Sequence, residues 1–306
     1  MPKIHVVRSA QINAPVSKVY DIVSDLGQWT PWSPWLIMDP DAKVDVKDGG
    51  KFYRWEGNRV GTGTLEVISE DKNQRVEFDL KFLAPWKSEA KTWMQVEPND
   101  GGTKLSWYMD SSLPFFMFFM KKMMVAFIGM DYERGLKMLR NYAEDGKVHS
   151  SLSFDGVRDY AGTRYAGIRR KISTDDIETA MTEDFTALGE WTGQGNDVTK
   201  NVFCIYHKFD IVKGVVDYTA AVTFDELPED IPEGFVTGTH TPTRLLTVTH
   251  TGPYEHLGNG WTAGMYMLRN KEYKGIKRYH PFETYANDPH STDPKDLITH
   301  INFPVK

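Results

Sequence analysis

Apolar and polar residues alternate in several short runs of the first half of the chain, which predicts an antiparallel sheet. Residues 4–13 form one run, and residues 76–82 and 105–109 carry an apolar side chain at every second position. Gly101 and Gly102 separate two such runs, a placement typical of a hairpin turn. A sheet of this kind has one apolar face, so another element must cover it.

A long helical segment at residues 115–144 is predicted to be that cover. Its apolar side chains recur every three or four positions, which is the period of one helix face: Ile128, Tyr132, Leu136, Leu139 and Ala143. A shorter helix is predicted after Pro15, because proline suits a first helical turn. These patterns predict an α+β fold for the first half of the chain.

The order of these elements, a strand, short helices, many strands and a long helix, resembles that of the SRPBCC superfamily, which includes START-like and polyketide cyclase/dehydrase proteins. Three segments carry the resemblance: "INAPVSKVYDIVSDLGQWTPWSPW", "VGTGTLEVISE" and "YERGLKMLRNYAE". The resemblance implies a domain over residues 1–145 with a helix-grip fold, in which the sheet wraps the long helix and leaves an apolar cavity. Members bind lipids, sterols and polyketides, and only some are enzymes.

Two groups of residues in this domain each have two interpretations. Trp29, Trp32 and Trp35 would either stack a ligand or cap the core, and we favour the core. Four methionines at the start of the long helix would form either an adaptable pocket wall or ordinary core, and core is again favoured: Met117, Met120, Met123 and Met124.

The second half of the chain repeats a pattern of strand, helix, strand and strand. A polar stretch at residues 146–156 is predicted to be a linker, after which the strand beginning at Thr163 returns at Thr243, an offset of 80 residues. The helices match at the same offset, with Ile177, Met181, Phe185 and Leu188 against Leu257, Trp261, Met265 and Leu268. The later strands match at an offset of 79, with Phe203 against Phe282 and Tyr206 against Tyr285.

Two such units predict one sheet with both helices on one face and a groove across a pseudo-twofold axis. The first helix has capping signals at both ends, with Ser173 or Thr174 before it and Gly193 after it. The whole chain is therefore predicted to be α+β, with a helix-grip domain followed by a duplicated strand-helix-strand-strand domain.

The second half resembles the GyrI-like family, also called the AraC-type effector-binding or multidrug-sensor domain. The segments "THTGPYEHL" and "FETYANDPHSTDPKDLITHINFPV" carry the resemblance, over residues 157–306. The resemblance implies that Glu283, in the "E-x-Y" strand, lies in a central cavity and meets cationic, lipophilic ligands. The family often has Gly-Pro before the third strand of the first repeat, where this chain has "NDVTKNVFCIYH". Because this segment would form the rim of the cleft, the rim is expected to differ in shape from that of the family.

The chemistry of Glu283 can also be argued from its neighbours in the sequence. In a strand, Glu283 and Tyr285 share one face, and a carboxylate beside aromatic rings suits a cation. The alternative is that Glu283 forms a salt bridge or points to solvent. Its counterpart in the first repeat is Cys204, so the pocket should carry one acid, off the pseudo-axis. The other predicted wall residues are Phe185, Trp191, Tyr206, Tyr254, Trp261 and Tyr285.

Composition narrows the classes of partner. Among 306 residues, 42 are Asp or Glu and 36 are Lys or Arg, so the basic face of a nucleic-acid binder is not expected. The single cysteine, Cys204, excludes an internal disulfide and fits a cytoplasmic protein. The apolar run at residues 113–120 is far too short to span a bilayer, and no membrane partner is expected. The nine histidines lack metal-site spacing, so neither metal nor cofactor is expected.

Three functional hypotheses follow. The favoured one is a small-molecule-binding or sensing protein without its own DNA-binding domain, whose ligands are hydrophobic or cationic, and no catalytic residue is assigned. The alternative is a hydrolase or cyclase in which Glu283 acts as general base or electrostatic stabiliser and Tyr254 or Tyr285 donates a proton. The third is an interaction module that binds a protein partner or forms a homodimer.

Overall fold

The computed structural model describes residues 2–193 and 202–306, which divide into two compact units. One unit runs from Met1 to His149 and the other from Ser150 to Lys306. Residues 196–201, part of the stretch expected to shape the rim of the cleft, lie outside the described residues.

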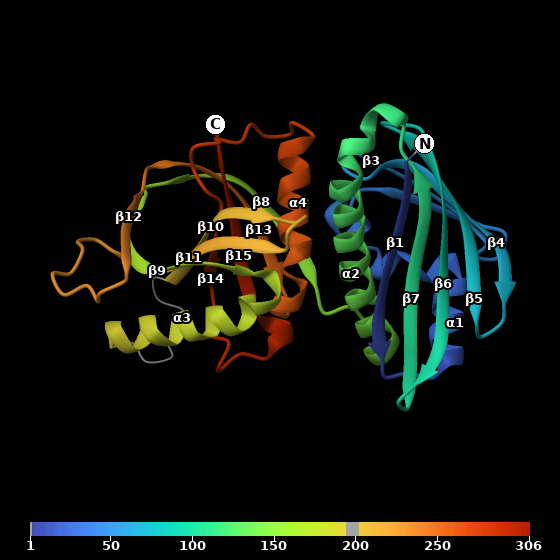
Figure 1. The fold of residues 1–306 in the computed structure, drawn as a ribbon, viewed down its shortest axis with the longest axis horizontal. Coiled ribbons are helices and arrows are strands. Elements are labelled where there is room, and N and C mark those ends of the chain that lie inside the picture. The colour runs from blue at the N-terminus through green and yellow to red at the C-terminus, as the bar shows by residue number, and fades with distance from the viewer. Residues whose placement is uncertain (1, 194–201) are drawn as a thin grey trace. The chain divides into compact units, whose positions relative to one another are not determined.

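The N-terminal unit is a seven-stranded antiparallel sheet with a long helix after its last strand (Figure 1). Its elements are β1 (Lys3–Ile12), α1 (Val16–Ser24), the 3-10 turns η1 (Leu26–Gln28), η2 (Thr30–Trp32) and η3 (Leu36–Met38), β2 (Lys43–Lys47), β3 (Phe52–Gly57), β4 (Gly61–Asp71), β5 (Arg75–Ala84), β6 (Ser88–Asn99), β7 (Gly102–Ser112), η4 (Phe115–Met120) and α2 (Lys121–Asp145). The strand order is β1-β7-β6-β5-β4-β3-β2.

The predicted long helix has two parts in the structure. Residues 115–120 form the 3-10 helix η4, and the α-helix proper begins at Lys121. It ends at Gly146, which adopts the left-handed conformation with φ 76° and donates its N–H to the Tyr142 carbonyl. Helix α2 packs along β1 and thereby covers the apolar face of the sheet, as the alternation of residues predicts.

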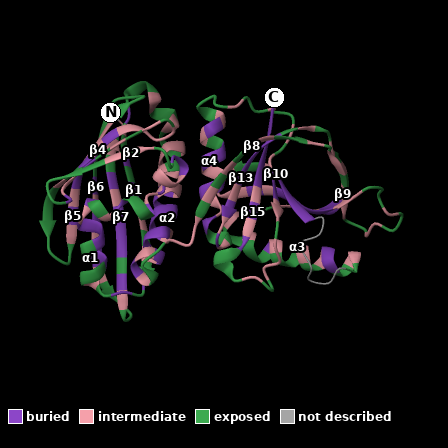
Figure 2. Cartoon of the chain, turned by 180° about the vertical axis from the view of Figure 1, so that it is seen from behind, coloured by how far each residue is buried: buried purple, intermediate pink, exposed green. Residues whose placement is uncertain are grey.

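Aromatic rings fill the interior between this sheet and α2. The rings of Trp107 on β7 and Tyr132 on α2 stack with centroids 4.0 Å apart, and Trp32 packs edge-on against Trp107 at 5.9 Å. Trp29 and Trp32 are buried and Trp35 is half-buried, which confirms the interpretation of the tryptophan group as core. Burial alternates along β6, and Figure 2 shows buried residues gathered on the sheet and on α2.

The C-terminal unit is an eight-stranded sheet with two helices (Figure 1). Its elements are β8 (Ser151–Tyr160), β9 (Thr163–Ser173), η5 (Thr174–Asp176), α3 (Ile177–Thr192), β10 (Val202–Asp210), β11 (Val215–Phe224), β12 (Val236–His240), β13 (Thr243–Thr251), η6 (Tyr254–His256), α4 (Gly258–Arg269), β14 (Phe282–Tyr285), η7 (Pro294–Asp296) and β15 (Ile298–Val305). The strand order is β12-β9-β11-β10-β14-β15-β13-β8.

The start of this unit differs from the expected linker at residues 146–156. From Ser151 onward the chain forms β8, which pairs antiparallel with β13. The half-buried side chains of Leu152 and Phe154 stand at alternate positions, so this segment has the strand period despite its serine-rich composition.

The two repeats meet at the centre of the sheet, where β10 pairs antiparallel with β14. Cys204 lies opposite Glu283, the residue that matches it at the offset of 79, and Phe203 and Ile205 lie opposite Thr284 and Phe282. A residue paired with its own repeat counterpart marks the pseudo-twofold axis. The axis therefore passes between Cys204 and Glu283, which places the single acid immediately beside it.

Both helices cover the face of the sheet that carries Glu283. Cys204 and Glu283 point to the same face because they are directly opposed in an antiparallel pair. Leu188 of α3 belongs to the buried cluster around Cys204, and Trp261 of α4 donates a hydrogen bond to Glu283. Helix α3 packs on β11 and β9, whereas α4 packs on β13 and β15, so each repeat supplies its own cover.

The predicted capping residues lie at the start of η5, the turn that leads into α3, and at the end of α3. The Ser173 hydroxyl accepts the N–H of Asp175 at 3.3 Å, and Gly193 closes the helix with φ 68°. Thr174 instead directs its hydroxyl to the Gly214 carbonyl at 3.4 Å.

The contact of α4 with the sheet leaves no room for a side chain at Gly264. A Cβ atom built there would overlap the ring of Phe303 on β15. Gly264→Ala is therefore expected to destabilise the C-terminal unit by about 1–3 kcal/mol through overpacking, although alanine is the better helix former. Urea unfolding followed by circular dichroism measures the change. The double variant with Phe303→Leu should lose less than the sum of the two single changes, and a stabilised Gly264→Ala protein would contradict the close contact.

Candidate functional site

The central feature of the C-terminal unit is the buried carboxylate of Glu283 on β14. Its residue is 1% exposed, and it lies between β10 and β15 at the middle of the sheet. A strand position at this place faces the helices, so the side chain points into the interior between sheet and helices rather than to solvent.

Three neutral side chains donate hydrogen bonds to this carboxylate. The hydroxyls of Tyr206 and Tyr285 both donate to Oε2, at 3.0 and 2.9 Å. The indole Nε1 of Trp261 donates to Oε1. Tyr206 and Tyr285 are repeat counterparts, so the pseudo-twofold axis brings two equivalent tyrosines onto one oxygen atom.

Further aromatic rings extend from these donors. Phe185 on α3 and Tyr254 on η6 each meet the Tyr285 ring edge-on, with centroids 5.6 and 5.9 Å apart. Tyr206 meets the Trp261 ring at 4.8 Å. The rings are half-buried or exposed while the carboxylate below them is buried. We call this group the acid cluster, and its members are Glu283, Tyr206, Tyr285, Trp261, Tyr254 and Phe185.

Trp191 is the predicted wall residue that the structure places elsewhere. Its ring lies against Phe224 and Phe235, at 5.6 and 5.2 Å, and its Nε1 donates to the Asp230 carbonyl at 3.0 Å. The sequence placed it at the end of the predicted helix that also carries Phe185. It stands at the far end of α3, where a different part of the chain packs on it.

Phe303 is a supporting residue that sequence reasoning missed. Its ring packs edge-on against Trp261 at 5.4 Å and holds the indole whose Nε1 reaches Glu283. The available signal was the alternation along the last strand, which places the buried Phe303 on the same face as Ile301.

The described partners of the Glu283 carboxyl are all uncharged. Burial raises the pKa of the Glu283 carboxyl, and the hydrogen bonds from Trp261, Tyr285 and Tyr206 only partly oppose this. Among the residues that the structure describes, none forms an ion pair with Glu283. The two alternatives for this residue, a salt bridge or a solvent-facing position, therefore do not hold for the described part of the chain.

The neighbouring hydroxyls and thiol are protonated donors at neutral pH. Burial, followed by the charge of Glu283, raises the pKa of Tyr254 to about 12, and the same causes raise the pKa of Tyr285 well above its usual value. Burial also raises the pKa of the Cys204 thiol, and Glu283 adds to that shift. A thiol held in this form is a poor nucleophile, as expected for an inert buried cysteine.

Each half of the chain matches the model of one known family. Residues 3–144 match the family described as polyketide cyclase/dehydrase and lipid transport, and residues 157–306 match the GyrI-like small molecule binding domain. The chain joins a polyketide cyclase/dehydrase domain to a GyrI-like domain. The α+β fold and the order of the two domains predicted from the sequence are thereby confirmed.

Several solved structures are similar to parts of the chain. SAV2435 bound to tetraphenylphosphonium is 16% identical, with TM-score 0.41, covering 50% of this chain and 94% of its own. The EcmrR–DNA complex is 14% identical, with TM-score 0.42, covering 60% and 68%. CalU16 from Micromonospora echinospora is 15% identical, with TM-score 0.33, covering 46% and 77%. Among curated proteins, none matches the chain.

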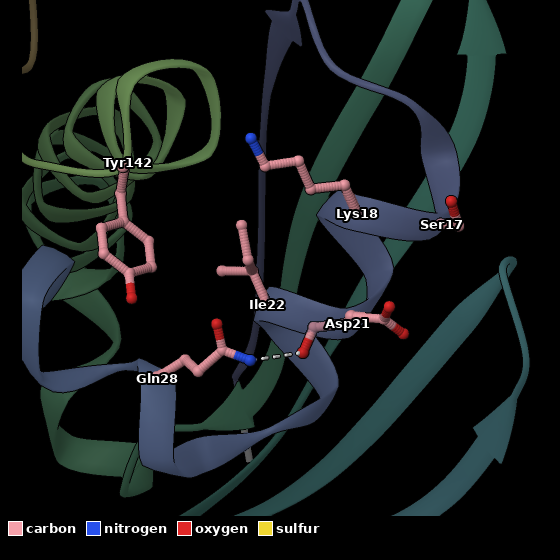
Figure 3. A pocket seen from close by; sticks show the side chains of 7 residues that line it. Ser17, Lys18, Asp21, Ile22, Gln28 and Tyr142 are labelled. Atoms are coloured by element: carbon pink, nitrogen blue, oxygen red, sulfur yellow. Dashed lines mark hydrogen bonds between the residues drawn. The ribbon is translucent and has the colours of Figure 1, made fainter.

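The cyclase/dehydrase domain has a surface hollow of about 400 Å³ between α1 and the end of α2 (Figure 3). It is lined by Ser17, Lys18, Asp21, Ile22, Gln28, Tyr142 and Gly146. The Gln28 amide closes one side by donating to the Asp21 carbonyl at 3.2 Å. This mixed polar lining differs from the apolar cavity that the helix-grip resemblance implies. The four methionines at residues 117–124 are half-buried, and Met117 and Met124 pack against the core.

Two further observations concern metals and membranes. In residues 2–193 and 202–306, no group of three or more His, Cys, Asp or Glu side chains is placed to hold a metal ion. Among the helices of the same residues, none is both long enough and apolar enough to cross a membrane.

The raised pKa of Glu283 predicts a pH-dependent stability. A carboxyl whose pKa is higher in the folded chain than its unfolded value of about 4.3 favours folding when it is protonated. Its contribution is complete below the unfolded pKa and is lost as the pH rises through the folded pKa. We therefore expect the free energy of unfolding of the wild type, relative to Glu283→Gln, to fall as the pH rises from the unfolded pKa of about 4.3 through the raised pKa of the folded carboxyl.

Chemical denaturation of both proteins across this pH range measures the difference. Subtracting the Glu283→Gln variant removes the titration of all other groups that the two proteins share. A difference that grows with pH would mean that the three hydrogen bonds outweigh burial and that the carboxylate is stable without a cation.

Proposed function

We propose that the GyrI-like domain binds lipophilic cations and that Glu283 supplies the opposite charge. The observation that carries the proposal is a buried carboxylate whose described partners are all neutral donors. An ionised group in such surroundings is unfavourable until a positive charge approaches it. A bound cation would supply that charge.

The aromatic members of the acid cluster support the same class of ligand. Ring faces attract cations by about 0.5–2 kcal/mol each and also offer apolar contact area. Tyr254 is exposed and Phe185 and Tyr285 are half-buried, so a ligand would meet these rings before the buried carboxylate. The site should therefore accept neutral lipophiles weakly and reject anions, since an anion would face the carboxylate in a region of low dielectric.

On this proposal the protein binds, senses or carries small molecules. The AraC-type effector-binding and multidrug-sensor roles describe this kind of domain, and its groove would open across the pseudo-twofold axis. In the catalytic alternative Tyr254 or Tyr285 would donate a proton, but the Tyr285 hydroxyl already donates to the carboxylate and burial raises the pKa of Tyr254 to about 12. Binding without turnover is thus the better-supported function.

A thermal-shift panel of three molecules of similar size tests the proposal. Tetraphenylphosphonium is a cation, tetraphenylborate is an anion of nearly the same shape, and triphenylphosphine oxide is neutral. At a concentration of about 100 times Kd, a ligand adds about 2.7 kcal/mol to the stability of the domain that binds it. We expect a shift with the cation, a smaller one with the neutral compound and none with the anion. Equal shifts with both ions, or no shift with any, would reject the proposal.

A further inference from the structure

An exposed group of aromatic side chains lies at one end of the cyclase/dehydrase domain, apart from the acid cluster. Residues 115–122 read "FFMFFMKK", and we call them the Phe segment. Phe115, Phe116, Phe118 and Phe119 are 78%, 73%, 61% and 71% exposed. Single exposed apolar residues are ordinary on protein surfaces, but four large rings within five residues call for an explanation.

The 3-10 geometry of η4 explains why these rings point outward. In a 3-10 helix, residues three apart lie on the same face, so Met117 and Met120 share one face of the segment. Both are half-buried, and Met117 packs against the domain core. The methionines therefore anchor the segment while the phenylalanines occupy the other two faces. The rings also group together, with the Phe118 centroid 6.3 Å from Phe115 and 6.0 Å from Phe119.

The hairpin between β5 and β6 adds a further exposed aromatic residue at the same end of the sheet. Phe82 pairs with Ser88, so residues 83–87 form the hairpin tip. Ala90 pairs with Ser111 near the end of β7, from which the chain leads into η4. The tip and the Phe segment thus lie at the same end of the strands, the upper end of this domain in Figure 1. Trp86 in the tip is 82% exposed.

Lysines directly follow these rings in the sequence, although the whole chain carries a formal net charge of −6 and the exposed Glu89 lies beside the hairpin tip. Lys121 and Lys122 directly follow the four phenylalanines, and Lys87 follows Trp86; all three lysines are exposed. The sequence contains no Asp or Glu between Asp110 and Asp131. This end of the domain therefore combines large exposed apolar rings with exposed lysines.

We propose that this end of the domain, with the Phe segment and the β5–β6 hairpin tip, docks on the surface of an anionic lipid bilayer. Phenylalanine and tryptophan rings would enter the boundary between headgroups and acyl chains, and the lysines would meet lipid phosphates. A second copy of the chain is a weaker candidate, because two such surfaces in contact would bring their lysines together and these would repel one another. The expectation of no membrane partner rested on the length needed to span a bilayer, and docking at its surface has no such requirement.

Co-sedimentation with vesicles tests the proposal on the full chain. The wild type is expected to bind phosphatidylcholine vesicles that contain phosphatidylserine, to bind pure phosphatidylcholine less, and to lose binding as salt rises. Phe118→Ser with Phe119→Ser should lower the partition coefficient by at least about tenfold, because each ring contributes transfer free energy. Lys121→Glu with Lys122→Glu should remove the preference for phosphatidylserine.

Phe209→Ser is the matched control, because Phe209 is an exposed phenylalanine, 48% accessible, on β10 of the other domain. It should bind vesicles as the wild type does, and thermal melts should show all variants folded. Failure of the wild type to bind, or equal losses in the control, would overturn the proposal. A wild-type protein that does not bind vesicles but forms a dimer in light scattering, which the phenylalanine substitutions dissociate, would also overturn it. A second copy of the chain would then occupy this surface.

Discussion

Glu283→Gln is expected to weaken the binding of tetraphenylphosphonium by about 30-fold or more, the lower end of the effect of truncating a buried charge pair. The substitution keeps the size of the side chain and removes its charge. The Tyr206, Tyr285 and Trp261 donors would still surround the position, so the shape of the site should survive. The neutral triphenylphosphine oxide should bind both proteins with similar affinity, because it makes no use of the charge.

Fluorescence or calorimetric titration of the purified variants provides the affinities. Glu190→Gln is a matched control, since Glu190 is an exposed glutamate on α3 of the same domain, and its loss should change cation binding little. A Glu283→Gln variant that binds the cation as tightly as the wild type does would show that the rings alone hold the ligand. Equal loss of cationic and neutral compounds would show that the substitution damaged the fold of the site.

The second large effect is expected from Trp107→Ala in the cyclase/dehydrase domain, with a loss of about 3–5 kcal/mol in unfolding free energy. Trp107 is 2% exposed, stacks on Tyr132 and donates its Nε1 to Thr92 Oγ1 at 2.9 Å. Removal leaves a large cavity and breaks this hydrogen bond. Because the chain folds as two compact units, the loss should appear in one thermal transition while the GyrI-like domain melts as before.

Trp93→Ala is the natural comparison. Trp93 lies on the neighbouring strand β6, is half-buried and stacks on Tyr108 at 4.9 Å on the opposite face of the sheet. Its truncation should destabilise the domain clearly less than that of Trp107. Differential scanning calorimetry separates the two domains. Similar losses for both tryptophans would contradict a sheet-and-helix interior filled by Trp107 and its neighbours.

The sheet, the helices and the repeat could be predicted because each depends on residues that are close in the sequence. A period of two or of 3.6 reports which face of an element is apolar, whatever lies across from it. The repeat offset also matched two residues that are distant in the sequence, Glu283 and Cys204. The structure places them opposite each other at the centre of the sheet. That pairing needed no knowledge of the loops between the repeats.

Other features depend on residues that are distant in the sequence, and sequence patterns do not report those contacts. Trp191 shares a helix with Phe185, but Phe224 and Phe235 determine where its ring packs. Trp261 was expected in the wall, yet its hydrogen bond to Glu283 follows from the packing of α4 on β15. The outward phenylalanines of η4 depend on a change from α to 3-10 geometry that apolar composition does not reveal.

Calorimetric titration of the wild-type chain with tetraphenylphosphonium, in two buffers of different ionisation enthalpy at mildly acidic pH, tests the central claim most directly. If Glu283 is the counter-charge, the cation binds at a single site and binding releases protons, because burial raises the pKa of this carboxyl and a bound cation opposes that shift. Triphenylphosphine oxide then releases none, and tetraphenylborate does not bind. Cation binding without proton release, or equally tight binding of tetraphenylborate, would contradict a buried carboxylate as the recognition element.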